Sequence, residues 1–319
     1  MHRIGYLLSD DFQVLSLATQ TVFEYANVVA ETPFYSIEFF SVVGGIVRSS
    51  LGLGIETRAL NNPGLADTWM IAGVNKPLDT RTSETALAFV RQAGQQARRV
   101  AGICTGGFVL AQAGLLDGRR ATTHWAYGAA LQRLYPQISV EDDRIFIIDG
   151  SMWTSAGMTA GLDLALGMVE KDLGPDVARS VAHKLVMHQR RSGGQSQHSE
   201  MLTLAPKSDR IQNALNYARQ NLHKPLSVEE LAEAVHLSPR QFTRVFTAET
   251  GQSPAKAIER LRLEAARVMI EQSRHSLDVI AKETGFRDRR HMREVFIRGF
   301  GIPPQAIRRD VRGVRGVRA

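Results

Sequence analysis

One pattern occurs twice in the last third of the chain and limits the fold more than any other feature of the sequence. The copies are offset by 49 or 50 residues, and the matched pairs are Leu231 with Ile280, Ala232 with Ala281, His236 with Gly285, Leu237 with Phe286, Phe246 with Phe296, Gly251 with Gly301, Pro254 with Pro304 and Ile258 with Ile307. In each copy a helix-start signal precedes the second helical stretch, Ser238-Pro239 in the first and Asp288 in the second. Two helices joined by a three- or four-residue turn form a helix-turn-helix unit. The repeat therefore predicts two such units, joined by a helix over Ala255–Glu271.

The second helix of each unit carries side chains suited to reading DNA. In the first copy, Phe242 and Phe246 share the face that should pack on the preceding helix. The outward positions, which are the predicted DNA contacts, are Arg240, Gln241, Thr243 and Arg244 in the first copy and Arg289, Arg290 and Arg293 in the second. In the major groove, arginine pairs with guanine and glutamine with adenine. Double-stranded DNA is therefore the predicted partner.

The distribution of charge favours the same interpretation. Residues 1–206 carry 17 basic and 19 acidic side chains, whereas residues 207–319 carry 22 basic and 13 acidic ones. The whole net charge of +7 thus belongs to the C-terminal third. Such a division is typical of a neutral module joined to one that binds a polyanion. Charge alone also leaves open a basic face that contacts only solvent.

The C-terminal third resembles a known family. Leu226–Phe246, Thr250-Gly251-Gln252-Ser253-Pro254 and the segment from Gly285-Phe286 to Gly301-Ile302-Pro303-Pro304 are similar to the AraC/XylS-type DNA-binding domain, over about residues 209–309. The resemblance implies two recognition helices in successive major grooves, about 10 base pairs apart. His236 departs from the family pattern, which often has glycine there, so we expect a slightly strained turn.

The first 175 residues alternate short apolar runs with helical patterns. Expected strands are Arg3–Leu8, Ser36–Val43, Thr68–Ala72, Val100–Ile103 and Ile145–Ile148. Expected helices are Leu15–Val29, Ser83–Ala97, Gly106–Ala113, Trp125–Leu134, Thr159–Leu173 and Asp176–Gln189. Strands separated by helices of this length need crossover connections, and they predict an α/β domain whose mostly parallel sheet is covered on both faces.

These patterns divide the chain into four parts. Residues 1–189 form the α/β domain, and the polar, glycine-bearing residues 190–207 form a linker. Residues 208–310 form an all-α domain with the two helix-turn-helix units. The Arg-rich residues 311–319 are an expected disordered tail, which either adds phosphate contacts or is only solvated.

The single cysteine of the chain, Cys104, stands between an apolar strand and a helix start. Small neighbours allow a sharp turn that presents the side chain above the sheet, with backbone N–H groups of Thr105 and Gly106 beside it. A thiol at a helix N-terminus has a depressed pKa, so Cys104 is a candidate nucleophile, with His124 as its candidate partner. The alternatives are a small residue that fills a tight turn and a histidine held by structural hydrogen bonds.

This part of the chain also resembles a known family. Ile103-Cys104-Thr105-Gly106, the stretch Gly114–Trp125 and Ser155-Ala156-Gly157 are similar to the PfpI-like, class I glutamine-amidotransferase-like domain. The similarity is greatest to the version of this domain that is fused to an AraC-type domain in GlxA-type regulators. Arg191–Gln197 also resembles the linker motif of those regulators. The resemblance implies a doubly wound, flavodoxin-like sheet with a pocket at the carboxyl ends of its strands. The expected ligand-binding residues there are Gly73, Cys104, Thr105, Gly106, His124 and Trp125.

The sequence departs from the enzymes of this superfamily at two positions. Ser16 aligns where they place an acid against the cysteine, although a slip in alignment brings Asp10 or Asp11 near, and Thr105 stands where protease-like members have histidine. A nucleophile without its base or acid loses most of its chemistry. The leading hypothesis is therefore a regulator, expected to be an activator, whose N-terminal pocket binds a small, nitrogenous effector. The alternatives are a cysteine-dependent hydrolase or amidotransferase-like enzyme, and a redox sensor that uses Cys104.

The remaining expectations concern partners and location. One cysteine excludes a disulfide framework and a Cys-rich zinc site, and we expect neither a metal nor a cofactor. No apolar run approaches the ~20 residues of a membrane span, and no signal-peptide pattern is present, so a soluble cytoplasmic protein is expected. We further expect a homodimer through residues 1–190, and contact with RNA polymerase if the protein activates transcription.

Overall fold

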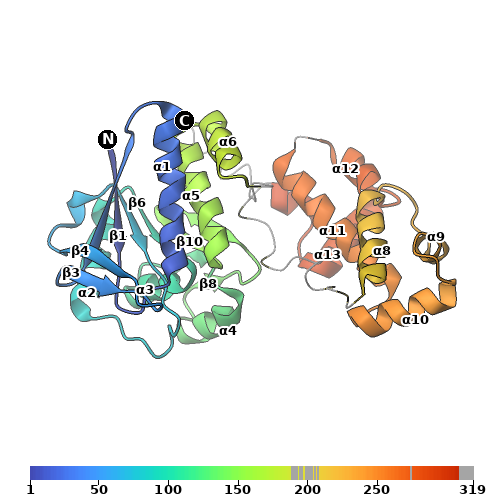
Figure 1. Cartoon of the computed structure of the whole chain (residues 1–319), viewed down its shortest axis with the longest axis horizontal. Coiled ribbons are helices and arrows are strands. Elements are labelled where there is room, and N and C mark those ends of the chain that lie inside the picture. The colour runs from blue at the N-terminus through green and yellow to red at the C-terminus, as the bar shows by residue number, and fades with distance from the viewer. Residues whose placement is uncertain are drawn as a thin grey trace. The chain divides into compact units, whose positions relative to one another are not determined.

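The computed structural model of the chain describes residues 1–187, 193, 197, 204, 206, 208–273 and 275–308. It forms two compact units that meet in the sequence at Gln197–His198 (Figure 1). This boundary falls inside the expected linker, most of which lies outside the described residues, as does the expected tail. Leu204, from the expected linker, is buried in a core of the C-terminal unit. No helix among the described residues is long and apolar enough to cross a membrane.

A mostly parallel sheet forms the centre of the N-terminal unit. Among the described residues its strand order is β3-β4-β2-β1-β5-β6-β10-β9, and only the outer pairs β3–β4 and β9–β10 are antiparallel. The strands are β1 (His2–Leu7), β2 (Tyr35–Ser41), β3 (Gly45–Arg48), β4 (Gly54–Ala59), β5 (Thr68–Ile71), β6 (Arg99–Gly102), β9 (Phe146–Asp149) and β10 (Met152–Ser155). A small separate sheet pairs β7 (Arg120–Ala121) with β8 (Ser139–Val140). The predicted doubly wound α/β fold is confirmed.

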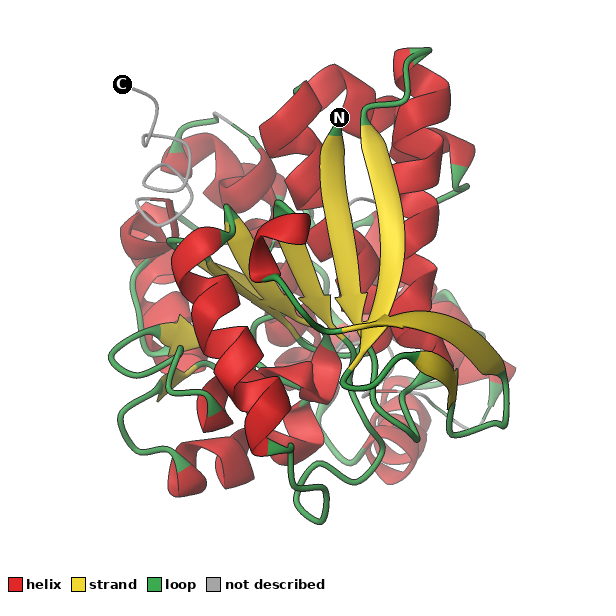
Figure 2. Cartoon of the chain, turned by 90° about the vertical axis from the view of Figure 1, so that its left-hand side faces the viewer, coloured by secondary structure: helices red, strands yellow, loops and turns green. Residues whose placement is uncertain are grey.

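Helices cover both faces of this sheet (Figure 2). Side chains alternate between the faces along each strand, so that Tyr6 and Met70 join one core while Leu7 and Ile71 join the other. The first core includes α1 (Thr19–Ala30), α5 (Met158–Leu173) and α6 (Pro175–Lys184). The second includes α2 (Glu84–Gln96), α3 (Gly107–Gln112) and α4 (Trp125–Leu134).

Several parts of the N-terminal unit, among them the small β7–β8 sheet, differ from the sequence-based expectation. The β3–β4 hairpin and β10 were not expected, and β10 adds the parallel strand beside β6. The last helix was expected to run to Gln189 but ends at Lys184. The backbone turns at Val186, whose φ of 53° is incompatible with a continuing right-handed helix.

A buried ion pair ties the sheet to α5. The Arg99 guanidinium at the start of β6 donates hydrogen bonds to both carboxylate oxygens of Asp172, and the Tyr35 hydroxyl donates a third at 2.9 Å. Arg98 adds a further ion pair at 3.0 Å. Because Asp172 and Arg99 are both almost fully buried, this pair fixes the position of α5 on the sheet.

The C-terminal unit contains the predicted pair of helix-turn-helix units. The described helices are α8 (Asp209–Gln220), α9 (Val228–Glu233), α10 (Pro239–Thr250), α11 (Pro254–Gln272), α12 (Leu277–Glu283) and α13 (Arg289–Phe300). One core packs around α9 and α10, and a second around α12 and α13. The connecting helix α11 contributes Ile258 and Leu261 to the first core and Leu263 and Ile270 to the second. Both copies are therefore supported by one continuous helix.

Candidate functional site

The second helix of the first copy, α10, buries one face and exposes the other. Phe242 and Phe246 are buried in the core, as predicted. Arg240, Gln241, Thr243 and Arg244 are all exposed. An open groove of about 840 Å³ lies between α10 and the start of α9. Its lining includes three of these four residues but not Gln241, and consists of Val228, Glu229, Pro239, Arg240, Thr243, Arg244, Thr247 and Ala248. An exposed helix face with a shallow groove beside it can enter the major groove of DNA.

Two polar side chains at the start of α10 stabilise the helix itself. The Ser238 hydroxyl caps α10, and Oε1 of Gln241 accepts hydrogen bonds from the Ser238 backbone and hydroxyl, which completes a capping box. Ser227 and Glu230 have the spacing of a second capping box, at the start of α9. The Ser227 cap is present there, but the Glu230 carboxylate accepts a hydrogen bond from the Tyr217 hydroxyl.

The second copy exposes its predicted arginines on α13. Asp288 caps this helix by accepting from His291 N at 2.7 Å. Arg289 lies 3.8 Å from Asp278, and Arg290 is paired with Glu294 at 3.1 Å. Arg293 is exposed and, within the described part of the chain, has no acidic partner. Such exposed pairs are weak and can exchange for phosphate or base contacts.

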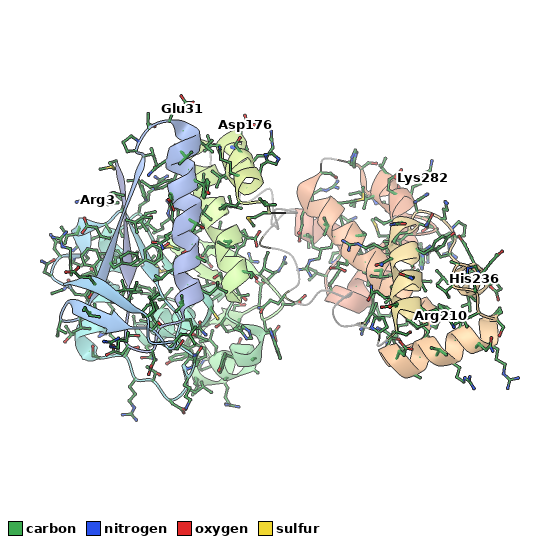
Figure 3. The ribbon with its side chains drawn as sticks, in the orientation of Figure 1. Arg3, Glu31, Asp176, Arg210, His236 and Lys282 are labelled. Atoms are coloured by element: carbon green, nitrogen blue, oxygen red, sulfur yellow. The ribbon has the colours of Figure 1, made fainter. Side chains whose placement is uncertain are left out.

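The turns inside the two helix-turn-helix units need a left-handed backbone. His236 has a φ of 55°, and the matching Gly285 has a φ of 74°. Figure 3 labels His236 in the turn between α9 and α10. Left-handed geometry costs a residue with a side chain about 1–2 kcal/mol, so the expected strain at His236 is present. No side chain fits at Gly285, because a Cβ there would lie 1.8 Å from the Leu222 carbonyl oxygen.

Cys104 occupies a sharp strand-to-helix turn, as predicted. It follows β6, starts a 3-10 turn over Cys104–Gly106 that leads into α3, and has a φ of 55°. The Cys104 N–H donates to the Ser155 hydroxyl at 3.4 Å, and its carbonyl accepts from the Thr123 hydroxyl at 3.0 Å. Only 1% of Cys104 is exposed. The backbone geometry is that of a nucleophile elbow, but the side chain is buried.

The environment of the thiol does not activate it. Burial raises the pKa of Cys104 to about 11, and a hydrogen bond from the Thr105 backbone offsets only part of this rise. The expectation of a depressed pKa is therefore wrong. Loss of hydration outweighs the N–H groups of a 3-10 turn that spans only Cys104–Gly106.

Gly73, Thr105 and Ser16 meet beside the elbow. The Thr105 hydroxyl donates to the Val74 carbonyl at 2.7 Å, and the Gly73 N–H donates to the Ser16 hydroxyl at 3.3 Å. A Cβ on Gly73 would lie 2.7 Å from the Thr105 hydroxyl and 2.8 Å from Oε1 of Gln13, so only glycine fits. That Gln13 oxygen is buried and has no hydrogen-bond partner among the described residues. Sequence reasoning missed Gln13, because nothing in its local pattern distinguishes it from a loop residue.

The acids of the first loop lie elsewhere. Asp10 accepts a hydrogen bond at 3.3 Å from the backbone N–H of Arg48, which lies on β3. Both Asp10 and Asp11 are exposed. Ser16 is fully buried beside Gly73. The residue that the loop brings next to Gly73 is thus the serine.

His124 and Trp125 begin α4. His124 Nδ1 accepts the Ala126 N–H at 3.2 Å and so acts as the helix cap. Its ring also faces Gly157, since His124 Cδ2 lies 3.6 Å from the position of a Cβ there. Trp125 is 54% exposed. Capping gives His124 a structural role, and its predicted role toward Cys104 or a ligand stays a prediction.

The fold and these two sites define a class of protein: an α/β domain with a cysteine elbow, followed by a duplicated helix-turn-helix domain that exposes arginines. Two family models match these parts. Residues 35–171 match the DJ-1/PfpI family, and residues 231–310 match a helix-turn-helix domain.

Relatives with established names match the chain over nearly its whole length. The HTH-type transcriptional regulator GlxA of Rhizobium meliloti is 31% identical over 97% of this chain and 96% of its own length. The HTH-type transcriptional regulator GbdR of Pseudomonas aeruginosa is 30% identical over 95% of this chain and 83% of its own length. The chain therefore belongs to this family of HTH-type transcriptional regulators, and it is a transcription regulator with a DJ-1/PfpI domain.

Two further similarities concern the N-terminal unit. The crystal structure of an AraC family transcriptional regulator from Pseudomonas putida has a TM-score of 0.53 at 23% identity, and the match covers 58% of this chain and 100% of that one. It supports the fold. An isonitrile hydratase from Pseudomonas putida is 35% identical over 57% of this chain and 77% of its own length. This domain type thus occurs both in regulators and in an enzyme.

Proposed function

We propose that the protein is a sequence-specific activator that reads double-stranded DNA with α10 and α13 and responds to a small nitrogenous metabolite bound beside Cys104. The observation that carries the DNA part is the exposure of arginines on two helices of matching design, Arg240 and Arg244 on one and Arg289, Arg290 and Arg293 on the other. The C-terminal third also holds the net positive charge. The protein would act in the cytoplasm, where bacterial regulators of this family meet chromosomal DNA.

The DNA part is tested by selecting bound sequences from a random double-stranded pool with the full chain. We expect an enriched motif in two parts whose centres lie about 10 base pairs apart, because the two helices would enter successive major grooves. Binding of equal strength to every sequence would contradict sequence-specific reading. Activation is measured with a reporter promoter that carries the selected site. Contact with RNA polymerase is inferred only if transcription from this promoter rises.

The proposal of an effector site rests on a buried polar atom beside the elbow that has no hydrogen-bond partner among the described residues. Buried polar atoms without a partner cost free energy, and Oε1 of Gln13 is such an acceptor beside Gly73 and Thr105. A ligand with an N–H group would satisfy it. This favours amino acids and amides over quaternary amines among nitrogenous metabolites.

A thermal-shift screen of the full chain tests this proposal. A ligand at 100 times its Kd raises the free energy of unfolding by about 2.7 kcal/mol. We expect an N–H-bearing metabolite to raise the Tm of the wild type but not of Gln13→Leu, whose side chain has similar volume and no acceptor. A ligand that shifts both proteins equally would place the effector away from Gln13.

We further propose that the N-terminal unit forms a homodimer through the β3–β4 hairpin. This hairpin is the edge of the sheet, and it exposes Val43, Ile46, Leu51 and Leu53. Exposed apolar side chains beside a free strand edge are typical of an interface. A dimer would bring two DNA-reading units to paired sites.

The second candidate function is a cysteine-dependent hydratase or hydrolase, which the similarity to isonitrile hydratase favours. Cys104→Ser separates the two functions. A regulator keeps DNA binding and much of its effector response, whereas an enzyme loses turnover. The raised pKa of Cys104 and the serine at position 16 support the regulator.

A further inference from the structure

The side chain of Gln197, the last residue of the N-terminal unit, is held by the main chain around the start of α4. Its Oε1 accepts the N–H of Trp125 at 2.8 Å. Its Nε2 lies 2.6 Å from the carbonyl oxygen of Asp142, 2.8 Å from that of Thr123 and 3.1 Å from that of Arg144. The Gln197 N–H donates to the Asp143 carbonyl at 3.2 Å.

These contacts recognise a carboxamide specifically. The oxygen meets an N–H in the first turn of a helix, which has no partner inside the helix, and the amide hydrogens meet carbonyl oxygens. A carboxylate could not donate to the carbonyls of Thr123, Asp142 and Arg144, and an alkyl side chain would leave both sets unsatisfied. The start of α4 and the segment Asp142–Arg144 together therefore form a built site for the Gln197 amide.

A second contact of the same segment is equally restrictive. Gly193 lies against Phe146, and a Cβ there would come within 2.5 Å of the Phe146 carbonyl oxygen. Among the described residues between 188 and 197, both Gly193 and Gln197 thus rest on the N-terminal unit.

A single residue, Thr123, contacts both Gln197 and the elbow. Thr123, whose carbonyl accepts from Gln197, donates its own hydroxyl to the Cys104 carbonyl. The next two residues are His124 and Trp125, which begin α4. A change of the backbone at the elbow would therefore alter the distances on which the Gln197 contacts depend.

We propose that the hydrogen bonds of Gln197 hold the end of the N-terminal unit against the start of α4, and we call this residue a latch. When these hydrogen bonds break, a conformational change at the elbow is transmitted to the DNA-binding unit. The inference rests on the proposed function. The DNA-binding unit begins at the next residue, His198, so an attached or released Gln197 fixes or frees the point at which the chain enters that unit. An effector that binds the two states with different affinity then shifts their populations.

Hydrogen exchange in the full-length protein tests the latch itself. In the wild type the Trp125 amide should be protected, because Gln197 accepts its hydrogen bond. Gln197→Ala and Gln197→Glu should raise the exchange rate of this amide at least tenfold. Gly193→Ala, which disturbs the segment elsewhere, should do so as well. Gln95→Ala, which removes an exposed glutamine of the same unit, is the control and should change nothing. Unchanged protection in Gln197→Ala would overturn the latch.

A reporter promoter carrying the selected DNA site tests the regulatory role. Without added metabolite, we expect Gln197→Ala and Gly193→Ala to change transcription at least threefold relative to the wild type and Gln95→Ala. If Trp125 loses protection but transcription stays at the wild-type level, the latch has no regulatory role and the inference is wrong. Failure of the proposed function is distinguishable, because the wild type itself would then select no DNA sequence.

Discussion

The backbone and the side chain of Cys104 have separate consequences. A φ of 55° gives the turn its shape, which brings Thr105 and Gly106 to the carboxyl edge of the sheet. Burial of the thiol keeps it neutral, because the pKa of Cys104 is about 11. The backbone shape of the elbow is thus independent of the ionisation of its thiol.

This predicts slow alkylation of Cys104. At pH 8 a thiol of pKa 11 is about a hundredfold less ionised than an ordinary cysteine, and only the thiolate reacts. We expect iodoacetamide to modify the native protein at least a hundred times more slowly than it modifies glutathione, with a rate that still rises with pH above 9. Mass spectrometry follows the reaction. Complete modification within minutes at pH 7 would show an activated thiolate and favour the enzyme.

The two left-handed turns predict opposite results for reciprocal substitutions. His236→Gly removes strain of about 1–2 kcal/mol but adds unfolded-state entropy, so we expect a net gain of roughly 0.5 kcal/mol in the free energy of unfolding. Gly285→Ala should lose roughly 2–5 kcal/mol, because its Cβ meets the Leu222 carbonyl. Urea denaturation measures both. A stable Gly285→Ala protein would mean that the two helix-turn-helix units pack differently.

At the scale of elements, the repeat was predictable because its signals are local. Ser238, Asp288, Gly251 and Gly301 act on their own helix ends, and the structure places each of them as a cap. The hairpin turn before β10, Asp149-Gly150, was an equally local signal that was missed. The β3–β4 hairpin is harder to predict, because glycines and exposed apolar side chains hide the alternation of a strand.

The candidate site was less predictable than the elements around it. Gly73, Thr105 and Gly106 follow strand ends, which a parallel sheet brings to one edge. Gln13 and Gln197 come from segments without periodicity, and their contacts depend on tertiary structure alone. The pKa of Cys104 could not be predicted either, since the sequence suggests the helix N-terminus but not the burial.

The recognition helices predict different effects for arginines with different surroundings. Arg240→Ala should weaken binding to the selected site by about 1–3 kcal/mol and relax the preference at one base pair, if Arg240 pairs with a guanine. Arg290→Ala should cost less, because its pair with Glu294 must first be broken. Arg179→Ala, an exposed arginine of the N-terminal unit, is the control. Fluorescence anisotropy with each single-base variant measures the effects, and an equal loss on every sequence would assign Arg240 to phosphate.

The contact between β6 and α5 predicts sensitivity to acid. Burial alone would raise the pKa of Asp172, but the hydrogen bonds and charge of Arg99 and the hydrogen bond from Tyr35 lower it below its ordinary value of 3.8. A carboxylate with a lowered pKa contributes stability above pH 4 that is lost as the pH falls through the folded-state value. His2 acts in the same direction below pH 6.5, because burial and Arg99 lower its pKa.

We therefore expect Asp172→Asn to lower the free energy of unfolding of the N-terminal unit by about 3–5 kcal/mol at pH 7, since Arg99 would be left buried without its partner. The difference between wild type and variant should shrink below pH 4. Urea titrations at several pH values measure it. A difference that is constant down to pH 2 would mean that Asp172 contributes through packing and not through its charge.

At the scale of the whole molecule, the two units have complementary properties. Residues 207–319 carry an excess of nine positive charges, while residues 1–206 are nearly neutral and expose the apolar edge of β3. Self-association is therefore less opposed by charge in the N-terminal unit than in the other. The same division leaves the arginines of the C-terminal unit available for DNA.

This division predicts that the dimer and the DNA contacts can be separated by substitution. Ile46→Lys places a charge on the 69% exposed edge residue, where it costs the monomer little but would be buried in a dimer. We expect this variant to sediment as a monomer at concentrations where the wild type is a dimer, and to bind one selected site normally but paired sites at least tenfold more weakly. Leu134→Lys, at the end of α4, is the matched control. A dimer that persists in Ile46→Lys would exclude the β3–β4 hairpin as the interface and leave another face of residues 1–187 to be tested.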